Sequence, residues 1–275
     1  MLAKPPPTSG SSAYSRRMSR RHVEWRHAWN IGVLAAAVLV FGYMAVVLIR
    51  PTPAPSYSPP PPDSGAMPSA PAAAAVTLQP IPSGAKVVAL GDSWAQATGA
   101  TSPDKGWLQL TARHFGWSLT VVPDGGGTGY LTPGPNNAGT YPQRLAKQPV
   151  DRSVDLVIVE GGVNDATLPK VDHADPAIAR TFREARAKYP QAQLLAVAEV
   201  STAPTPWPGL VTISDEIAHE AAVASPPVPV IVPIQDHWLG GRFMHRGGPL
   251  NGHPTDHGYA VLSHLLEHAV SGLEG

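Results

Sequence analysis

The sequence contains no cysteine among its 275 residues. Disulfide bonds, thiolate metal sites, a cysteine nucleophile and a lipid-modified cysteine are therefore excluded. The compartment stays open, because a domain of about 190 residues buries enough apolar surface to fold without cross-links.

Charged residues are also scarce, at 15% of the chain, and the formal net charge is zero. This balance gives no reason to expect a nucleic-acid or an acidic partner. The neutral total conceals an uneven distribution, because six basic residues and one acid, Glu24, lie within the first thirty residues. The remainder of the chain is therefore net acidic. The six basic residues are Lys4, Arg16, Arg17, Arg20, Arg21 and Arg26.

A long apolar run covers residues 31–49 without a single charge. At about 1.5 Å per residue, a helix over this run crosses a hydrocarbon core of about 30 Å. We therefore predict a transmembrane helix at residues 30–50, after a basic, disordered cytoplasmic tail at residues 1–29. A cleaved signal peptide is the alternative, although its apolar region is usually only about 7–15 residues. Because positive charges stay on the cytoplasmic side, the later residues are expected outside the membrane.

Residues 51–83 have the composition of a linker. Eleven prolines lie between Pro51 and Pro82, with Asp63 as the one charge. Such a segment cannot bury a core, and its prolines favour extended polyproline II. Fully extended, it would reach roughly 100 Å, which is long enough to hold a domain within or beyond a cell-wall layer. An ordinary spacer explains the composition equally well.

From residue 84 onward, short apolar runs alternate with segments of helical character. This alternation is typical of a parallel sheet covered by helices on both faces. We therefore predict one α/β domain at residues 84–275. Its expected strands cover residues 86–90, 119–122, 155–159, 194–200 and 228–234, and its expected helices cover 108–115, 176–188 with Asp175 as cap, 213–223 and 256–270.

Three of the expected strands are followed by distinctive segments. These are GDS at 91–93, DGGG at 124–127 and GGVND at 161–165. In parallel sheets, ligands bind outside the carboxyl ends of the strands, where these segments would meet. The sequence therefore predicts a site at this edge of the sheet.

Four residue types could take part in catalysis: three of them lie in these segments, and the fourth, a histidine, lies near the C-terminus. Ser93 would lie near a helix N-terminus, with its hydroxyl exposed and backbone N–H groups ready to bind an oxyanion. His253 precedes the last expected helix and could act as general base for a serine. The glycines at 125–127 allow a backbone N–H to approach a bound group, and the Asn164 amide could donate to an oxyanion. Taken singly, each residue has an ordinary explanation as a turn, a cap or a flexible loop.

The surroundings of His253 are rich in histidine, and a histidine cluster can bind metal. No HExxH or similar ligand spacing is present, so no catalytic metal is expected. The glycine loop lacks the Gly-Lys-Ser/Thr ending of a phosphate-binding loop, and nothing indicates a cofactor. The neighbouring histidines are His237, His245 and His257.

Together and in this order, the segments resemble the SGNH (GDSL-type) hydrolase family. Gly91-Asp92-Ser93 resembles the first block, a glycine within 125–127 the second, Gly162-Val163-Asn164-Asp165 the third, and His253-Pro254 with Gly258 the last. The order and approximate spacing match over nearly all of residues 85–270. The resemblance implies a flavodoxin-like three-layer sandwich with a central parallel sheet.

The resemblance also implies a mechanism. Ser93 attacks an ester carbonyl, while His253 takes its proton and later gives it to the leaving alcohol. The N–H of Ser93, the N–H of Gly127 or alternatively Gly126, and the Asn164 amide stabilise the oxyanion. Losing one such donor typically costs about 100–1000-fold in rate. The supporting candidates within the motifs are Asp92 and Asp165.

One position departs from the family pattern. The family usually has an aspartate three residues before the histidine, where this chain has Leu250. Three interpretations remain: a Ser–His dyad whose ring is held by a backbone carbonyl or by Asn251, an acid from elsewhere such as Asp236 or Asp256, or lost activity. The question matters because removing the orienting acid of a triad can cost about 10,000-fold in kcat.

Two kinds of function follow from this pattern. We expect a serine esterase or acyltransferase, held outside the membrane, that acts on acyl groups of cell-envelope glycans or lipids. The alternative is a catalytically impaired module that binds a glycan or a partner protein, and the missing acid supports it. Four aromatic residues near the site loops either form a sugar platform or belong to the core: Trp94, Trp107, Trp117 and Tyr130.

Overall fold

A computed structural model describes residues 76–135, 138–168 and 171–274. The predicted tail, the predicted transmembrane helix and residues 51–75 of the predicted linker lie outside these residues. Within the described ranges, no helix is both long and apolar enough to cross a membrane.

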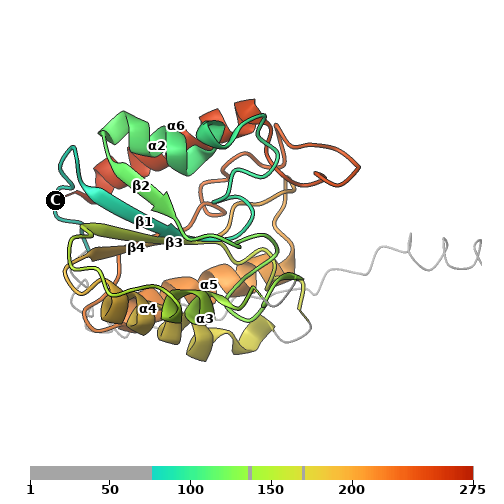
Figure 1. Cartoon of the computed structure of the whole chain (residues 1–275). Coiled ribbons are helices and arrows are strands. Elements are labelled where there is room, and N and C mark those ends of the chain that lie inside the picture. The colour runs from blue at the N-terminus through green and yellow to red at the C-terminus, as the bar shows by residue number, and fades with distance from the viewer. Residues whose placement is uncertain (1–75, 136–137, 169–170, 275) are drawn as a thin grey trace, which may run out of the picture. The chain divides into compact units, whose positions relative to one another are not determined.

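The centre of the domain is a five-stranded, all-parallel sheet (Figure 1). Its spatial order is β2-β1-β3-β4-β5. The chain places β2 on one side of β1 and then β3 on the other, so the strand order reverses between β1 and β3. This order confirms the predicted parallel sheet, and it creates a switch point where ligands bind in such folds. The strands are β1 (Lys86–Leu90), β2 (Ser118–Val121), β3 (Leu156–Glu160), β4 (Gln193–Val197) and β5 (Val230–Ile231).

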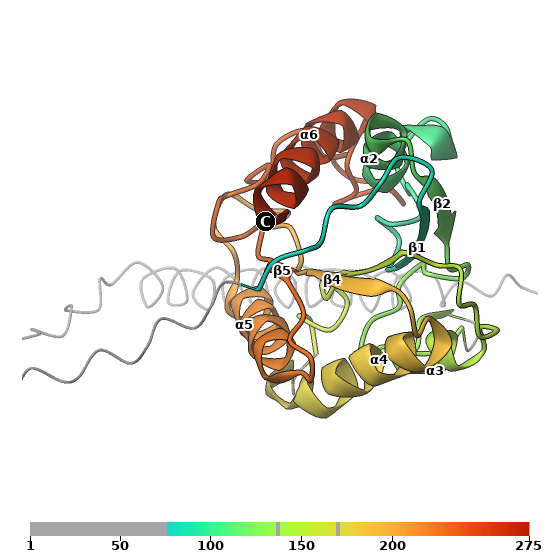
Figure 2. The same ribbon diagram turned by 90° about the vertical axis from the view of Figure 1, so that its left-hand side faces the viewer.

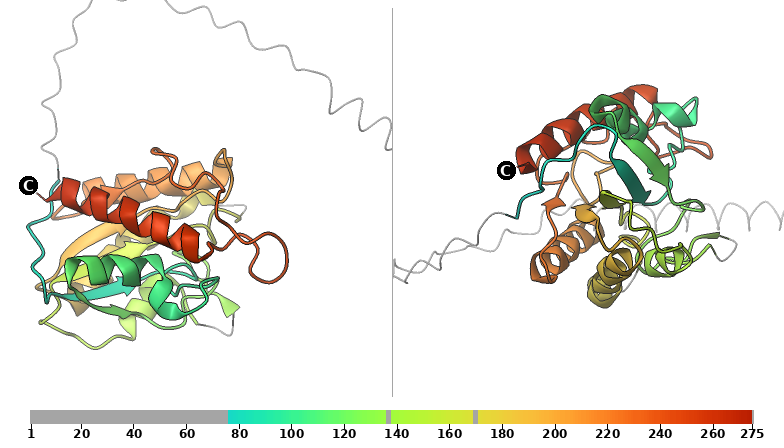
Figure 3. Two further views of the ribbon diagram at one scale, coloured as in Figure 1. Left: turned by 90° about the horizontal axis from the view of Figure 1, so that it is seen from above. Right: turned by 60° about the vertical axis from the view of Figure 1, so that its left-hand side comes forward.

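Helices cover both faces of the sheet, as Figure 2 shows. One face carries α2 (Trp107–Phe115) and α6 (Asp256–Leu273), which lie side by side over the strands (Figure 3). The other face carries α3 (Tyr141–Ala146), α4 (Asp175–Lys188) and α5 (Pro208–Val223). The three-layer arrangement expected from the sequence is therefore present.

Alternation along β1 explains why two cores form. Val87 and Ala89 belong to the core beneath α2 and α6, whereas Val88 and Leu90 belong to the core beneath α3 to α5. Successive side chains of a strand point to opposite faces, so a continuous apolar run supplies both layers. All five residues of β3 are buried, as a central strand requires.

Several element boundaries differ from the sequence expectation. The last two strands end earlier than expected, at Val197 and Ile231. Asp175 is not a cap but the first residue of α4, because Ala174 occupies the N-cap position without a side-chain bond. The short helix α3 was not expected. It begins at Tyr141, after a capping box formed by Thr140 and Gln143. A helix of six residues is too short to show a clear periodicity in the sequence.

The domain also begins before residue 84. Leu78 is fully buried, its N–H donates to the Leu273 carbonyl at 2.9 Å, and Ile81 is bound through its N–H to the Glu274 carboxylate. The end of the predicted linker is therefore part of the folded unit.

Candidate active site

Ser93 follows the first strand at the carboxyl edge of the sheet. Residues 93–99 form a run of turns and not the helix N-terminus expected from the sequence, since α2 begins only at Trp107. Within this run the Asp92 carboxylate accepts the Trp94 N–H at 2.8 Å, and the Ser93 carbonyl accepts the Thr98 N–H at 2.9 Å. Ser93 is half-buried within this turn.

His253 meets Ser93 across the sheet edge. Its Nε2 lies 2.9 Å from the Ser93 Oγ, although the two residues are 160 positions apart in the sequence. The histidine lies on a loop between β5 and α6 that the Thr255 cap holds at the start of α6. This separation is a hydrogen-bonding distance, as the pairing of a serine nucleophile with a general base requires.

The other ring nitrogen of His253 faces a backbone carbonyl. Nδ1 lies 3.3 Å from the Leu250 oxygen, which also accepts the His253 N–H at 3.0 Å. Gly252, at φ +80°, allows the tight turn that folds this carbonyl under the ring. A carbonyl accepts but cannot donate, so Nδ1 carries the hydrogen and Nε2 accepts from Ser93.

This geometry matches one of the interpretations left open by the missing aspartate. The Asn251 side chain accepts the Gly247 N–H instead of contacting the ring. Asp256 is occupied by Thr101 and Lys105, each at 2.7 Å. Asp236 is exposed and has no hydrogen bond to His253. The ring is therefore held by the carbonyl of Leu250, the residue at the position where the family has its acid.

The pKa of His253 is lowered from its usual value, chiefly because partial burial disfavours the imidazolium. The hydrogen bond to Leu250 opposes this effect, and nearby His245 adds to it. A lowered pKa keeps the ring neutral near pH 7, which is the form that accepts a proton from serine.

Gly99 allows the two loops to come this close. A Cβ at Gly99 would lie 2.6 Å from the Pro254 oxygen and 2.9 Å from the His253 Cβ. Its φ of +98° also favours glycine. The His245 ring contacts the Gly99 carbonyl at 2.7 Å and fixes the same junction.

Groups able to donate to an oxyanion lie on the serine turn and on the loops that follow β2 and β3. Among the described residues, the N–H groups of Ser93, Gly126 and Gly127 have no hydrogen-bond partner, and Gly127 has a φ of +70°. The Asn164 amide reaches this region from the loop after β3. Its Nδ2 donates to the Thr128 carbonyl at 2.9 Å and to the Asp92 carboxylate at 3.2 Å. The amide is therefore held near the serine turn by two internal acceptors.

The family profile of the GDSL-like lipase/acylhydrolases matches residues 89–261, which is more than half of the chain. The chain belongs to this family. The matched range runs from β1, which precedes Ser93, through the loop that carries His253 into α6.

Solved structures of related fold include esterases and an acyltransferase. A salicylyl-acyltransferase from a tetracycline biosynthetic pathway is 18% identical, with a TM-score of 0.50 over 70% of this chain and 56% of its own. A carbohydrate esterase family 2 enzyme from Corynascus thermopiles is 17% identical, with a TM-score of 0.52 over 75% of this chain and 68% of its own. The family 2 carbohydrate esterase from Clostridium thermocellum, solved with cellohexaose, is 18% identical, with a TM-score of 0.51 over 70% and 65%.

At these identities the likeness concerns the fold, and this GDSL-like hydrolase spans little more than half of the acyltransferase. Among curated proteins, none matches the sequence.

Asp165, the last residue of the third motif, organises the glycine loop of this hydrolase. Its buried carboxylate accepts the N–H groups of Tyr130, Leu131 and Thr132 at 2.6–3.0 Å and the Thr132 hydroxyl at 2.8 Å. A Cβ at Gly129 would lie within 2.6 Å of this carboxylate, so the site requires glycine there. Asp165 therefore fixes the segment that follows Gly127.

Arg144, on α3, was not recognised from the sequence. It is buried, and its guanidinium donates to the carbonyls of Gly91, Val122 and Pro123 and to the Thr128 hydroxyl, at 2.7–3.2 Å. It thus joins the carboxyl ends of β1 and β2 to the glycine loop. A lone arginine in an unrecognised short helix gives no signal in the sequence.

Two buried acids, Glu160 and Glu199, were also missed. Together with Asp92 they place three carboxylate oxygens within 4.8 Å of one another. Burial raises the pKa of Asp92 to about 7 and the pKa values of both glutamates well above their usual range. The available signal was an acid within or at the end of an otherwise apolar strand, where charges are rare.

The four aromatic candidates belong to the core. Trp94, Trp107, Trp117 and Tyr130 are each less than 10% exposed. They pack in the two apolar layers and cannot form a sugar platform, so that option is wrong.

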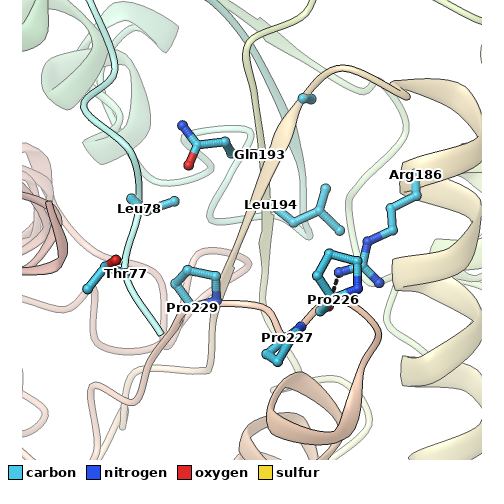
Figure 4. Close-up of a pocket in the computed structure, with 9 residues that line it drawn as sticks. Thr77, Leu78, Arg186, Gln193, Leu194, Pro226, Pro227 and Pro229 are labelled. Atoms are coloured by element: carbon cyan, nitrogen blue, oxygen red, sulfur yellow. Dashed lines mark hydrogen bonds between the residues drawn. The ribbon is translucent and has the colours of Figure 1, made fainter. Parts of the chain in front are cut away.

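A pocket of about 240 Å³ lies away from this site (Figure 4). Gln193, Leu194 and Pro229, at the amino ends of β4 and β5, line it together with Leu78. Arg186 at its rim is bound to the carbonyls of Ser225 and Pro226. Ser93 lies at the carboxyl edge of the same sheet, so this pocket and the candidate active site lie at opposite ends of the strands.

Proposed function

We propose that this chain is a serine esterase in which Ser93 and His253 act as a dyad oriented by the Leu250 carbonyl. The observation that carries the proposal is the continuous contact from the Ser93 Oγ to His253 Nε2, at 2.9 Å, and from His253 Nδ1 to the Leu250 oxygen, at 3.3 Å. This arrangement supplies both the base and its orientation without a carboxylate.

The reaction proceeds in two halves. As the Ser93 Oγ bonds to the acyl carbon, its proton moves to His253 Nε2. Collapse of the tetrahedral adduct breaks the ester C–O bond, and the imidazolium returns the proton to the departing alcohol. In the second half, water or another hydroxyl attacks the acyl carbon while His253 accepts its proton. The bond from the acyl carbon to the Ser93 Oγ then breaks, and the imidazolium returns the proton to this oxygen.

The oxyanion is stabilised by the free N–H groups of Ser93 and Gly127, with Gly126 as alternate, and by the Asn164 amide. Asn164 joins by exchanging the Thr128 carbonyl for the oxyanion, while its bond to the Asp92 carboxylate is kept. Each such donor is worth about 100–1000-fold in rate.

A carbonyl in place of the usual acid has a consequence for rate. It fixes the tautomer of His253, but its partial charge stabilises the imidazolium less than a carboxylate would, and 3.3 Å is long for an N–H···O bond. We therefore expect a slower enzyme than a full triad, whose acid is worth up to about 10,000-fold.

The proposed substrates are acyl esters on cell-envelope glycans or lipids, and the proposed location is the outer side of the membrane, with residues 31–49 as anchor. The uncharged apolar run, the basic residues before it and the proline-rich segment after it support the location. The similarity of fold to carbohydrate esterases supports a glycan ester. Protease treatment of intact spheroplasts tests the location: removal of the folded domain is expected, and its protection would reject the proposed orientation.

The activity is tested with the full chain on short- and long-chain p-nitrophenyl esters and on acetylated xylo-oligosaccharides. Ser93→Ala should lower kcat by about a thousandfold or more. Ser118→Ala, an exposed serine at the opposite edge of the sheet, is the matched control and should change nothing. Equal hydrolysis by wild type and Ser93→Ala would reject the serine mechanism. Glycerol added as a competing acceptor distinguishes hydrolysis from acyl transfer by the product formed.

A further inference from the structure

Three buried acids lie directly beneath the catalytic loops. Asp92 follows β1, Glu160 ends β3 and Glu199 follows β4, so adjacent strands bring them to one point. Each is at most 2% exposed, and one oxygen from each lies within 4.8 Å of the others. The esterase mechanism proposed above uses none of them as base, nucleophile or oxyanion donor.

Each of these acids holds a backbone or amide group of the catalytic loops. Glu160 accepts the Asp92 N–H at 3.3 Å, next to Ser93. Glu199 accepts the Val163 N–H at 3.1 Å, next to Asn164. Asp92 accepts both the Trp94 N–H and the Asn164 amide, at 2.8 and 3.2 Å. The cluster therefore has bonds to both sides of the proposed nucleophile and to the proposed oxyanion amide.

The chain makes room for Glu160 at a specific point. A Cβ on Gly91 would lie 2.2 Å from the Glu160 Oε1. The glycine of the GDS segment thus lets the carboxylate pack against the backbone of the nucleophile turn. An apolar residue at 160 could fill the space, but it would leave the buried Asp92 N–H without a partner.

The charge of the cluster requires protons or a cation. Three ionised carboxylates in a dry site repel one another and lose their hydration. No ion pair joins them to a cation within the described part of the chain, because Arg144 gives its hydrogens to carbonyls and to Thr128. The positive charge of Arg144 still lowers the pKa of Asp92, but burial outweighs it. Among the remaining groups near the cluster, Asp165 adds to the repulsion, and three tyrosines are neutral: Tyr130, Tyr141 and Tyr259.

We propose that Glu160 and Glu199 are positioning residues that share protons with Asp92 and thereby hold the Ser93 turn and the Asn164 loop in their reactive arrangement. The inference rests on the proposed function, since it assigns these acids to the same site. Losing the shared protons would drive the three carboxylates apart, and the loops bonded to them would move with them. Activity should therefore decline as pH rises past the range in which the cluster ionises.

The test uses Glu160→Gln and Glu199→Gln in the full chain, with Glu184→Gln on α4 as control. Glutamine keeps the acceptor for the backbone N–H but cannot ionise. In wild type, kcat should fall about tenfold or more between pH 7 and 9 with KM nearly unchanged. The glutamine variants should lose much of this alkaline decline, whereas Glu160→Ala and Glu199→Ala should lower kcat about tenfold or more at pH 7. A purely structural role would change the melting temperature and leave the shape of the pH profile as in wild type.

Carboxyl ¹³C titration of the wild-type chain gives a second measurement that needs no variant. At least one of the three carboxyls should be protonated at pH 6; three ionised carboxyls at that pH would overturn the proposal. A stoichiometric divalent ion in the purified chain, removed by chelation and lost in Glu199→Gln, would also overturn it in favour of a cation site. If wild type itself hydrolyses no ester, the proposed function fails. If wild type is active and both glutamine variants keep its pH profile, only the positioning role fails.

Discussion

Gly99, at the end of the turn that begins at Ser93, packs against the loop that carries His253. Gly99→Ala should lower kcat/KM by about 100-fold, because the new methyl group would displace Pro254 and His253 by a sizeable fraction of an ångström. Ester hydrolysis and a melting curve measured on the same sample separate displacement from unfolding. Gly272→Ala, whose Cβ would meet nothing within 4 Å, is the control. Wild-type activity in a folded Gly99→Ala chain would mean that the His253 contact tolerates this displacement.

The protonation of His253 sets the acid side of the pH profile. Because partial burial lowers the pKa of this imidazole, its neutral form persists below the pH at which an exposed histidine becomes charged. The kcat/KM of the free enzyme should therefore rise with pH through a midpoint below about 6.5, the usual histidine value. A midpoint clearly above that value would indicate that a carboxylate stabilises the imidazolium, contrary to the Leu250 contact.

Helix α3 stabilises the carboxyl ends of β1 and β2 through Arg144. Arg144→Met should lower the free energy of unfolding by at least about 3 kcal/mol, because buried carbonyls of Gly91, Val122 and Pro123 would lose their donor. Urea unfolding measures the change. Arg180→Met on α4 removes an exposed ion pair and should change stability by less than about 0.5 kcal/mol. Similar effects for the two variants would show that Arg144 does not hold the strand ends together.

The elements that the sequence predicts well are those with strong periodicity. The strand predicted at 86–90 has the bounds of β1, and the predicted bounds of α2 and α6 are correct to within a few residues. Helix α3 escaped prediction because six residues give too little periodicity, and β5 is short because its pairing with β4 ends after two residues. The local sequence pattern therefore predicts the layers of the fold, whereas the ends of individual helices and strands depend on tertiary contacts.

The candidate site, like the fold, could be predicted only in part from the sequence. Motif order brought Ser93, Asn164 and His253 to one edge of the sheet, because carboxyl ends of parallel strands converge. From the sequence, an unspecified backbone carbonyl was only one of several possible partners of the His253 ring, since a backbone contact depends on the turn and not on the residue type. Arg144, Glu160 and Glu199 act through burial, which the linear sequence shows only as a charge among apolar neighbours.

At the scale of the whole molecule, the buried acids couple stability to pH. The folded pKa of Asp92, about 7, exceeds its unfolded value near 3.8, so the folded state binds more protons between these values. This contribution is fully present below about pH 4 and is lost as pH rises through about 7. The free energy of unfolding should therefore decrease from pH 5 to 8, with the lowered pKa of His253 partly opposing the trend.

Urea unfolding at pH 5 and pH 8 measures this slope. Asp92→Asn, which cannot ionise, should reduce it, whereas Asp215→Asn, an exposed residue on α5, should leave it unchanged. An identical slope in wild type and Asp92→Asn would contradict a shared-proton cluster in the folded state.

Intact-mass analysis of the full chain after treatment with a fluorophosphonate tests whether the Ser93 hydroxyl is an activated nucleophile. A single adduct is expected on wild type and on Ser118→Ala, no adduct on Ser93→Ala, and labelling of His253→Gln slowed by about 100-fold or more. No adduct on a folded wild-type chain, or an adduct that persists in Ser93→Ala, would contradict the dyad and favour a module that binds a glycan or a partner without chemistry.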